Sequence, residues 1–286
     1  VTLAIDEGVR HNPAATESAF RKVLADEGDV LPAARRAELL SQIGRTLGLQ
    51  RRFDEAHEIL KEAFELAGDD PIARCRCRLE KGRAFNSAGN KEKALECFTN
   101  ALAEARRATA GSGSRDPDFY VVDALHMLAI AAQSEEQMRW HREALSVAEA
   151  SANPATRNWM GSLTNNLAWT LHDAGQYEEA LEVFQKALAF RREQGNPKPI
   201  HIAKWSVARC MRSLGRIEEA LAIQRELLAS GESDGFVEEE MGECLLALGR
   251  EDEAKPHFAK AYEMLSKVDW MVANEKDRLN RLRKLS

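Results

Sequence analysis

The sequence predicts an all-α protein built from repeated helical hairpins, and three observations lead to that fold class. Five segments of the chain align with one another, apolar residues recur at helical spacing, and glycine and proline fall between the periodic stretches. The 286 residues are 44% hydrophobic and 30% charged. That composition can bury a large core, and it excludes a disordered or a collagen-like chain.

A pattern of 21 residues recurs at 43–63, 81–101, 167–187, 207–227 and 241–261. Each copy carries a small residue, an apolar residue three positions later, a turn position, and an alanine five residues after the turn. The turn position holds glycine in four copies and Arg51 in the first. Two closely packed helices need small side chains where their backbones meet, and a left-handed glycine ends a helix. The repeated unit is therefore predicted to be a helix, a tight turn and a second helix.

This unit resembles the tetratricopeptide repeat over roughly residues 36–268. The third copy matches eight defining positions of that family, which are Leu167, Ala168, Leu171, Gly175, Tyr177, Ala180, Phe184 and Ala187. Other copies depart at single positions: Arg51 replaces the turn glycine, Lys91 and Glu251 replace the first aromatic residue, and Gln224 replaces the second. The long-period copies look like the kinesin-light-chain-like subset. The resemblance implies a right-handed superhelix, or solenoid, of about six antiparallel helix-turn-helix repeats with terminal capping helices.

The domain organisation follows from where the pattern begins, weakens and ends. Residues 1–35 are expected to form an N-terminal helical cap or partial repeat, residues 36–268 the repeat array, and residues 269–286 a C-terminal amphipathic capping helix. Residues 123–150 read as a degenerate sixth repeat, and 109–118, TAGSGSRDPD, as a loop within the array. Prolines are expected to precede or open the first helix of a hairpin, where a missing N–H costs little, at Pro32, Pro71, Pro117, Pro154 and Pro197.

One stripe of each first helix is the candidate binding site, because in the resembled family that stripe lines a concave groove. The register places there Arg45, Arg76, Arg83, Asn86, His126, Asn165, Trp169, His172, Trp205, Arg209 and Arg212, with Asn166 beside it. Tryptophan and arginine often carry binding energy at protein interfaces, and arginine recognises carboxylates bidentately. We therefore expect the groove to bind an extended or helical peptide of acidic or carboxylate character, anchored near Trp169 and Trp205.

A simpler interpretation of the stripe stays open at this point. Any single member can be a solvated surface residue, and Trp205 can pack against a neighbouring helix. The carboxylate clamp of chaperone-binding repeats is not reproduced, since only Asn166 matches its pattern while His126, Ile130, Ile202 and Ser206 stand at the flanking positions. Binding of chaperone tails is therefore not implied.

Catalytic, cofactor and metal sites are not expected. The sequence lacks a phosphate loop, a dinucleotide fingerprint and a G-x-S-x-G motif, and GSGS at 111–114 lacks a flanking strand and helix. Cys75 and Cys77 have the wrong spacing for paired metal ligands and are expected to pack between helices. His172 and Asp173 are adjacent on a helix, so their side chains should diverge by about 100° and not orient one another.

Charge and cysteine content bound the partners and the compartment. A net charge of −6 and a pI near 5.8 make nucleic acid an unlikely partner, although a continuous basic face would favour RNA. No apolar run approaches the roughly 20 residues of a membrane span. The first residues, VTLAIDEGVR, lack the pattern of a secretory signal. Five cysteines, an odd number, suit a reducing compartment and predict a cytoplasmic protein.

Self-association is the alternative function. The acidic run Glu238 to Glu240 with Glu243, and the basic tail from Lys276 to Lys284, read first as solvated helix faces. They are also complementary in charge, so they could meet head to tail between two copies of the chain. A homo-oligomeric structural scaffold is therefore the second hypothesis beside the peptide-binding module.

Overall fold

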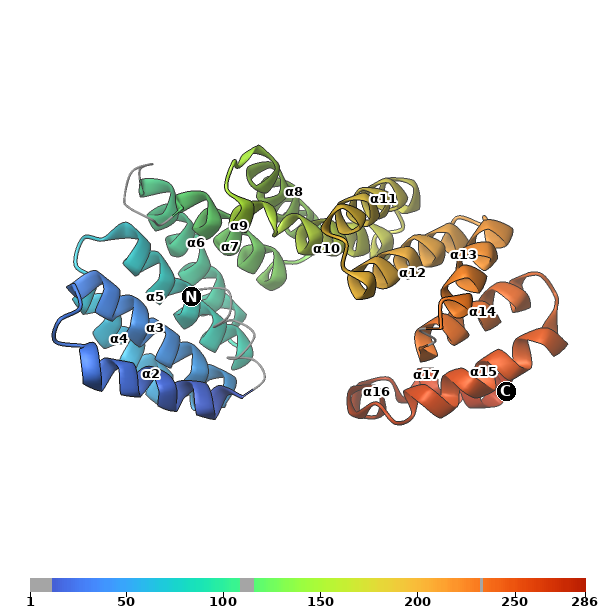
Figure 1. Cartoon of the computed structure of the whole chain (residues 1–286), viewed down its shortest axis with the longest axis horizontal. Coiled ribbons are helices and arrows are strands. Elements are labelled where there is room, and N and C mark those ends of the chain that lie inside the picture. The colour runs from blue at the N-terminus through green and yellow to red at the C-terminus, as the bar shows by residue number, and fades with distance from the viewer. Residues whose placement is uncertain (1–11, 109–115, 232–233) are drawn as a thin grey trace. The chain divides into compact units, whose positions relative to one another are not determined.

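The computed structural model describes residues 12–108, 116–231 and 234–286, and all regular secondary structure in these ranges is α-helical (Figure 1). The first part of the predicted N-terminal cap and the glycine-serine segment at 111–114 lie outside the described residues. None of the helices in the described ranges is long and apolar enough to cross a membrane. The chain divides into two compact units, residues 1–163 and 164–286, with the boundary inside α10 (Met160–Asp173).

Unit 1 is built from three helical hairpins preceded by one helix. Its helices are α2 (Pro13–Glu27), α3 (Ala33–Leu49), α4 (Phe53–Leu66), α5 (Pro71–Ser87), α6 (Lys91–Arg107), α7 (Pro117–Ala131), α8 (Ser134–Ala150) and the short α9 (Pro154–Arg157). Helices α3 and α4, α5 and α6, and α7 and α8 pack as pairs, and each hairpin also contacts the next. The degenerate repeat at 123–150 is thus a complete hairpin. The predicted loop at 109–118 is shorter than expected, because Asp116 caps α7 and the helix begins at Pro117.

Unit 2 continues the same arrangement. After α10 it contains α11 (Tyr177–Gln194), α12 (Pro197–Ser213), α13 (Ile217–Ala229), α14 (Gly235–Ala247), α15 (Glu251–Leu265), α16 (Asp269–Asn274) and α17 (Lys276–Leu285). Four of the five junction prolines are first residues of α5, α7, α9 and α12, and Pro32 is the N-cap of α3. Pro154 opens only the four-residue α9, so the predicted first helix is interrupted before α10.

The hairpin turns confirm the alignment of the repeats. Gly89, Gly175, Gly215 and Gly249 stand at the turn position and have φ between +72° and +85°. Arg51 occupies the same position in the first hairpin with φ +61°, and among the described residues it is the one non-glycine residue with positive φ. The fold therefore imposes a left-handed turn even at Arg51, where the side chain makes this backbone conformation strained.

Small residues let the two helices of a hairpin approach closely. A Cβ atom added to Gly82 would lie 2.4 Å from Cε1 of Phe98, and one added to Gly242 would lie 2.7 Å from Cε1 of Phe258. Both phenylalanines are buried, with at most 1% of their surface exposed. The aromatic side chain of the second helix thus fills the space that glycine leaves on the first helix, whereas the pattern predicted small residues because two backbones meet there.

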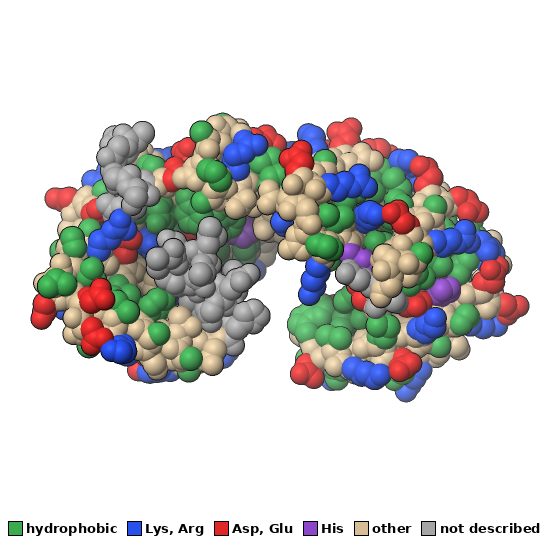
Figure 2. All heavy atoms as spheres, in the orientation of Figure 1, with side chains coloured by type: hydrophobic (Ala, Val, Ile, Leu, Met, Phe, Trp, Pro, Cys, Tyr) green, Lys and Arg blue, Asp and Glu red, His purple; other side chains and the backbone are tan. Residues whose placement is uncertain are grey.

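The C-terminal cap differs from the single helix expected over residues 269–286. The chain breaks at Glu275, whose φ of −122° and ψ of 39° are not helical, and two helices result. Met271 and Leu282 are fully buried, but Trp270 is 56% exposed. Figure 2 shows hydrophobic side chains gathered on the surface around α16. The break allows α17 to pack against α15 and to bring Arg278 to α14.

Candidate binding site on the first helices

In unit 2 the residues of the predicted stripe lie on α10 and α12; side chains of α14 contact them, and side chains of α17 contact α14 in turn. We term this set of side chains the unit-2 first-helix face. Its members are Asn165, Asn166, Trp169, His172, Trp205, Arg209, Arg212, Phe236, Glu239, Glu240, Glu243, Arg278 and Arg281. Each first helix contributes neighbouring positions of the same register, so contacts along the face run from one hairpin to the next.

Aromatic rings form a row along this face. The ring centroids of Trp169 and Trp205 are 5.9 Å apart, and those of Trp205 and Phe236 are 6.0 Å apart. Trp205 Nε1 donates a hydrogen bond to the carbonyl oxygen of Phe236 at 3.1 Å. The guanidinium carbon of Arg209 lies 5.9 Å and 5.8 Å from the ring centroids of Trp169 and Trp205, within cation–π range. The two tryptophans are thus side by side and half-buried, and Trp205 also packs against the neighbouring helix.

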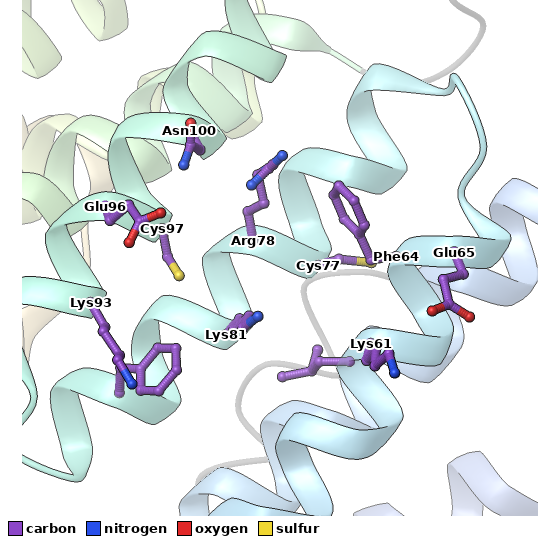
Figure 3. A pocket seen from close by; sticks show the side chains of 12 residues that line it. Lys61, Phe64, Glu65, Cys77, Arg78, Lys81, Lys93, Glu96, Cys97 and Asn100 are labelled. Carbon is purple, nitrogen blue, oxygen red and sulfur yellow. The ribbon is translucent and has the colours of Figure 1, made fainter.

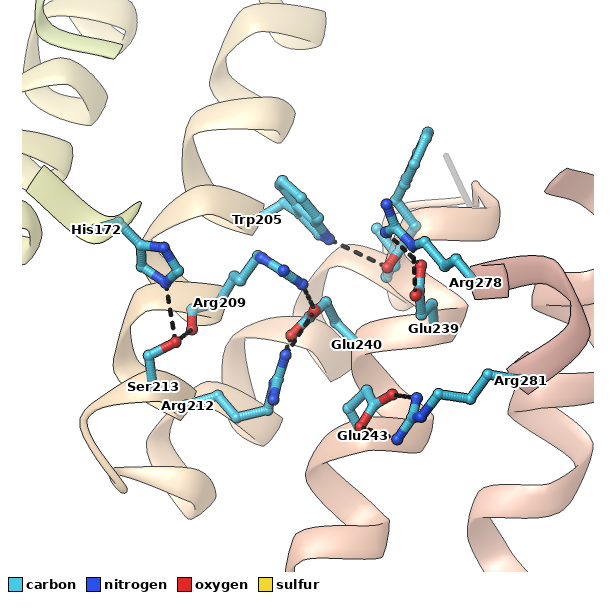
Figure 4. A network of polar contacts seen from close by, with 12 residues as sticks. His172, Trp205, Arg209, Arg212, Ser213, Glu239, Glu240, Glu243, Arg278 and Arg281 are labelled. Carbon is cyan, nitrogen blue, oxygen red and sulfur yellow. Dashed lines mark hydrogen bonds and ion pairs between the residues drawn. The ribbon is translucent and has the colours of Figure 1, made fainter. Parts of the chain in front are cut away.

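A chain of ion pairs runs beside the aromatic row (Figure 4). Glu240 is 1% exposed and accepts hydrogen bonds from Arg209 and from Arg212, the latter at 2.7 and 3.0 Å. Glu239 accepts two from Arg278, at 2.7 and 2.6 Å. Burial alone would lower the pKa of Arg212, but the hydrogen bonds to Glu240 raise it. Glu240 is therefore held by two guanidinium groups, and Glu239 is held by one in a bidentate contact.

These ion pairs give the charged residues a different role from the one that the sequence suggested. Arg209 and Arg212 were expected to recognise a carboxylate on a partner, yet they hold a buried carboxylate of this chain. The acidic run on α14 and the basic tail on α17 were read first as solvated helix faces, with pairing between two copies as the alternative, yet Arg278 and Arg281 pair with Glu239 and Glu243 within one chain. The charges that suggested a partner are neutralised locally.

His172 lies at the edge of the face and bonds to a serine. Its Nε2 is 2.9 Å from Oγ of Ser213, and its Nδ1 is 3.6 Å from Oδ1 of Asp173. The sequence predicted that the His172 and Asp173 side chains would point about 100° apart. Their 3.6 Å separation is closer than that implies, but it is too long for a hydrogen bond. Ser213 Oγ donates to the carbonyl oxygen of Arg209 at 3.3 Å. A catalytic triad needs a continuous hydrogen-bonded chain from serine through histidine to aspartate, and this set lacks the last link.

The pKa of His172 is lowered, chiefly by burial, which outweighs the opposing effect of the neighbouring Asp173 carboxylate. The positive charges of Arg209 and Arg212 act in the same direction as burial. The ring is therefore neutral at pH 7, and its contact with Ser213 is a hydrogen bond between neutral groups.

Asparagine side chains on α10 differ from the arginines. Asn165 and Asn166 are half-buried, and within the described ranges neither side-chain amide makes a hydrogen bond. Only the backbone of Asn166 is engaged here: its carbonyl oxygen accepts a hydrogen bond from Thr170. A side-chain amide can donate to and accept from a peptide backbone. These two residues are thus the polar members of the face with unused hydrogen-bonding capacity.

In unit 1 the predicted arginines are also held by internal acids. Arg83 contacts Glu80 at 2.7 Å and Asp123 at 2.5 Å, and Arg45 lies 3.7 Å from Glu80. Burial alone would raise the pKa of Asp123, but the charge and hydrogen bond of Arg83 lower it. Asn86, another polar candidate in this unit, makes no side-chain hydrogen bond to any described residue.

Arg76 completes the unit-1 set. Its Nη1 is 3.0 Å from Oε2 of Glu38 and 3.4 Å from the hydroxyl oxygen of Tyr120. Burial would lower the pKa of Arg76, yet its contacts with Tyr120 and Glu38 raise it. Like the other predicted arginines, this one joins neighbouring hairpins of its own unit.

The two histidines of the third hairpin lie close together. The ring centroids of His126 and His141 are 6.3 Å apart, and Trp159 lies 5.2 Å from His126. His141 is 2% exposed, and burial, helped by the charge of His126, lowers its pKa to about 4. Its neutral ring belongs to the core of unit 1.

Cys75 and Cys77 pack between helices, as expected from the sequence. Cys75 and Cys77 are buried and lie in separate hydrophobic clusters of unit 1, and burial raises the pKa of Cys77 to about 12. Across the described ranges, no group of three or more histidine, cysteine or acidic side chains is arranged to hold a metal ion.

Comparison with known proteins agrees with this architecture. Residues 36–67 and 162–193, which fall on α3 with α4 and on α10 with α11, match the tetratricopeptide repeat family. No curated protein matches the chain.

Three solved structures are similar to it. A putative kinesin light chain of Podospora anserina with nearly identical tetratricopeptide-like repeats is 18% identical, with 71% of this chain and 99% of that one covered and a TM-score of 0.54. The apo form of RapI is 16% identical, with 93% and 74% covered and a TM-score of 0.71. The APC/C hetero-tetramer Cut9–Hcn1 is 15% identical, with 96% and 47% covered and a TM-score of 0.56. The chain thus has the fold of tetratricopeptide-repeat proteins, and two of its hairpins match the repeat of that family in sequence.

Proposed function

We propose that this chain is a non-catalytic protein-interaction module that binds a peptide segment on the unit-2 first-helix face. The observation that carries the proposal is the row of Trp169, Trp205 and Phe236 beside the unengaged amides of Asn165 and Asn166. Aromatic side chains supply most of the binding energy at such surfaces, while amides fix the direction of a bound backbone. Among the structural neighbours, Cut9 is assembled with Hcn1, which is consistent with a partner-binding role.

The internal ion pairs refine the kind of peptide that we expect. A partner carboxylate would have to displace Glu240 from Arg209 and Arg212, and separating a buried ion pair is costly. Apolar or aromatic side chains that rest on the tryptophan row need no such displacement. We therefore propose a partner recognised first by an apolar anchor and by its backbone, with acidic character as a secondary feature. The free state of all five cysteines fits a cytoplasmic setting for this interaction.

Selection of peptides from a random library on the purified chain tests this proposal. Peptides enriched in aromatic or large aliphatic residues are expected, and their affinity is then measured by fluorescence anisotropy. Trp169→Ala should weaken binding by about 30-fold, the effect of a typical interface hot spot. Asn166→Ala should weaken it by roughly 2- to 10-fold, the loss of one hydrogen bond, without changing stability, because the amide has no internal partner.

Trp270→Ala is the matched control, because this tryptophan is 56% exposed in the same unit but lies on α16, outside the face. Its removal should leave peptide affinity unchanged. Peptides that bind equally well to the wild type, Trp169→Ala and Asn166→Ala would refute the site. Light scattering of the same samples at low and high salt tests the self-association alternative, which requires an oligomer that dissociates when salt is added.

A further inference from the structure

A second feature of unit 1 is unrelated to the first-helix face. A hollow of about 400 Å³ opens between α4, α5 and α6. Figure 3 shows the side chains that line it, with Arg78 from α5 and Cys97 from α6 reaching toward the space between the helices. We term it the α4–α6 hollow. Its cationic members are Lys61, Arg78, Lys81 and Lys93.

The hollow carries excess positive charge in a chain whose net charge is −6. Its four cations face only two lining carboxylates, Glu65 and Glu96. Within the described ranges, Lys61, Lys81 and Lys93 make no ion pair. This absence contrasts with the first-helix faces, where every predicted arginine is neutralised.

Arg78 is only weakly compensated. Its nearest carboxylate is Glu104, with Nε 3.7 Å from Oε1, and its buried Nε donates no hydrogen bond in the described part of the chain. Glu104 is already engaged by Arg74 and Arg107, each at 2.8 Å. Burial alone would raise the pKa of Glu104, and these hydrogen bonds lower it. One carboxylate thus serves three guanidinium groups, which leaves positive charge at this edge of the hollow.

Aromatic rings line the same space. Arg78 lies 4.6 Å from the ring centroid of Phe64, and the ammonium groups of Lys81 and Lys93 lie 6.0 Å and 5.4 Å from that of Phe85. Cation–π contacts of this kind hold charged groups near a ring without neutralising them. The hollow therefore combines apolar walls with cations that still have donors to offer.

We propose that the α4–α6 hollow binds a small organic anion in which a phosphate or carboxylate group is joined to an apolar body. Lysine ammonium groups act as point charges toward an oxyanion, and Phe64 and Phe85 contact the apolar part. An inorganic anion would contact the cationic groups but would leave the two phenylalanine rings without a partner. This site is independent of the peptide-binding proposal, since it lies on other helices and in the other unit.

Calorimetric titration with phenyl phosphate, benzoate and phenol tests the proposal. Phenyl phosphate or benzoate should bind, and phenol, which lacks the charge at neutral pH, should not. Tighter binding of phenyl phosphate identifies a phosphate ligand, and equal or tighter binding of benzoate identifies a carboxylate. The double variant Lys81→Gln with Lys93→Gln should weaken binding on the order of 10-fold, because each exposed charge contributes modestly near a protein surface.

Cys97 localises the bound anion. Its thiol lines the hollow and is half-buried, whereas the other four cysteines are buried, so alkylation by iodoacetamide should occur there first. Bound phenyl phosphate should slow that alkylation in the wild type but not in the double variant. Lys186→Gln, an exposed lysine of α11 without an ion pair in the described ranges, should change neither readout. Absence of binding by both charged probes, or binding that leaves Cys97 alkylation and the double variant unaffected, would overturn the proposal.

Discussion

Replacement of Gln224 by leucine should stabilise this protein. Gln224 is fully buried on α13, and neither Oε1 nor Nε2 of its side chain has a hydrogen-bond partner in the described part of the chain. The equivalent positions of the other four aligned copies hold Leu60, Phe98, Phe184 and Phe258, each at most 1% exposed. Glutamine therefore stands at a core position that its neighbours fill with apolar side chains.

The magnitude follows from the cost of an unsatisfied buried amide. Leaving such a group without a hydrogen bond costs roughly 1–3 kcal/mol, and leucine has a similar volume and removes that cost. Gln224→Leu should raise the free energy of unfolding by about 1–3 kcal/mol. Urea denaturation followed by circular dichroism should show a higher midpoint with an unchanged slope, because the surface exposed on unfolding stays the same.

The exposed Gln185 of α11 provides the matched control. Gln185→Leu makes the same chemical change on a helix surface, so the free energy of unfolding should move by less than about 0.5 kcal/mol. If Gln224→Leu were destabilising, or no more stabilising than this control, the buried amide would have to be hydrogen-bonded and the reasoning would fail.

Three further predictions concern the core and the ion pairs. Gly82→Ala should lower the free energy of unfolding by about 1–3 kcal/mol, measured by urea denaturation, because the added methyl group overlaps the ring of Phe98. Buried neutral His141 has a folded pKa of about 4 against 6.5 when unfolded, so up to about 3 kcal/mol of stability should be lost as the pH falls from 6.5 to 4. Thermal melts across this pH range should show that loss, and His141→Leu should reduce it. Arg278→Ala leaves the 5% exposed Glu239 without its bidentate partner and should cost about 3–5 kcal/mol, whereas Arg278→Lys should recover part of this in the same urea assay.

The hairpins were predictable because each rests on local chemistry that repeats. Turn glycines, small residues opposite buried aromatic residues, and prolines at helix starts all act within one repeat of about 40 residues. Even the departure at Arg51 was placed correctly, since the surrounding pattern fixes the turn whatever residue occupies it. The break at Glu275 was not predicted, because an amphipathic spacing over residues 269–286 fits one helix as well as two.

The ion pairs on the first helices were missed for a different reason. Each joins residues that lie about one repeat apart, with separations of 38 between Glu38 and Arg76, 39 between Glu239 and Arg278, and 31 between Arg209 and Glu240. Opposite charges at that spacing on one stripe are a signal that the sequence contains. Treating each charge alone, as solvated or as ligand-binding, conceals it, because the partner comes from the next hairpin. The α4–α6 hollow left no comparable signal, since its lysines come from three helices at no common spacing.

This spacing separates two roles on the same helix face. Because the arginines pair across hairpins, removing one should lower stability and disturb any bound peptide only indirectly. Asn165 and Asn166 have no internal partner, so their removal should lower affinity while leaving stability intact. If Arg209→Ala and Asn166→Ala lost stability and peptide affinity in the same ratio, this division of roles would be wrong. Measuring both quantities for both variants therefore distinguishes residues that hold the repeats together from residues that remain available to a partner.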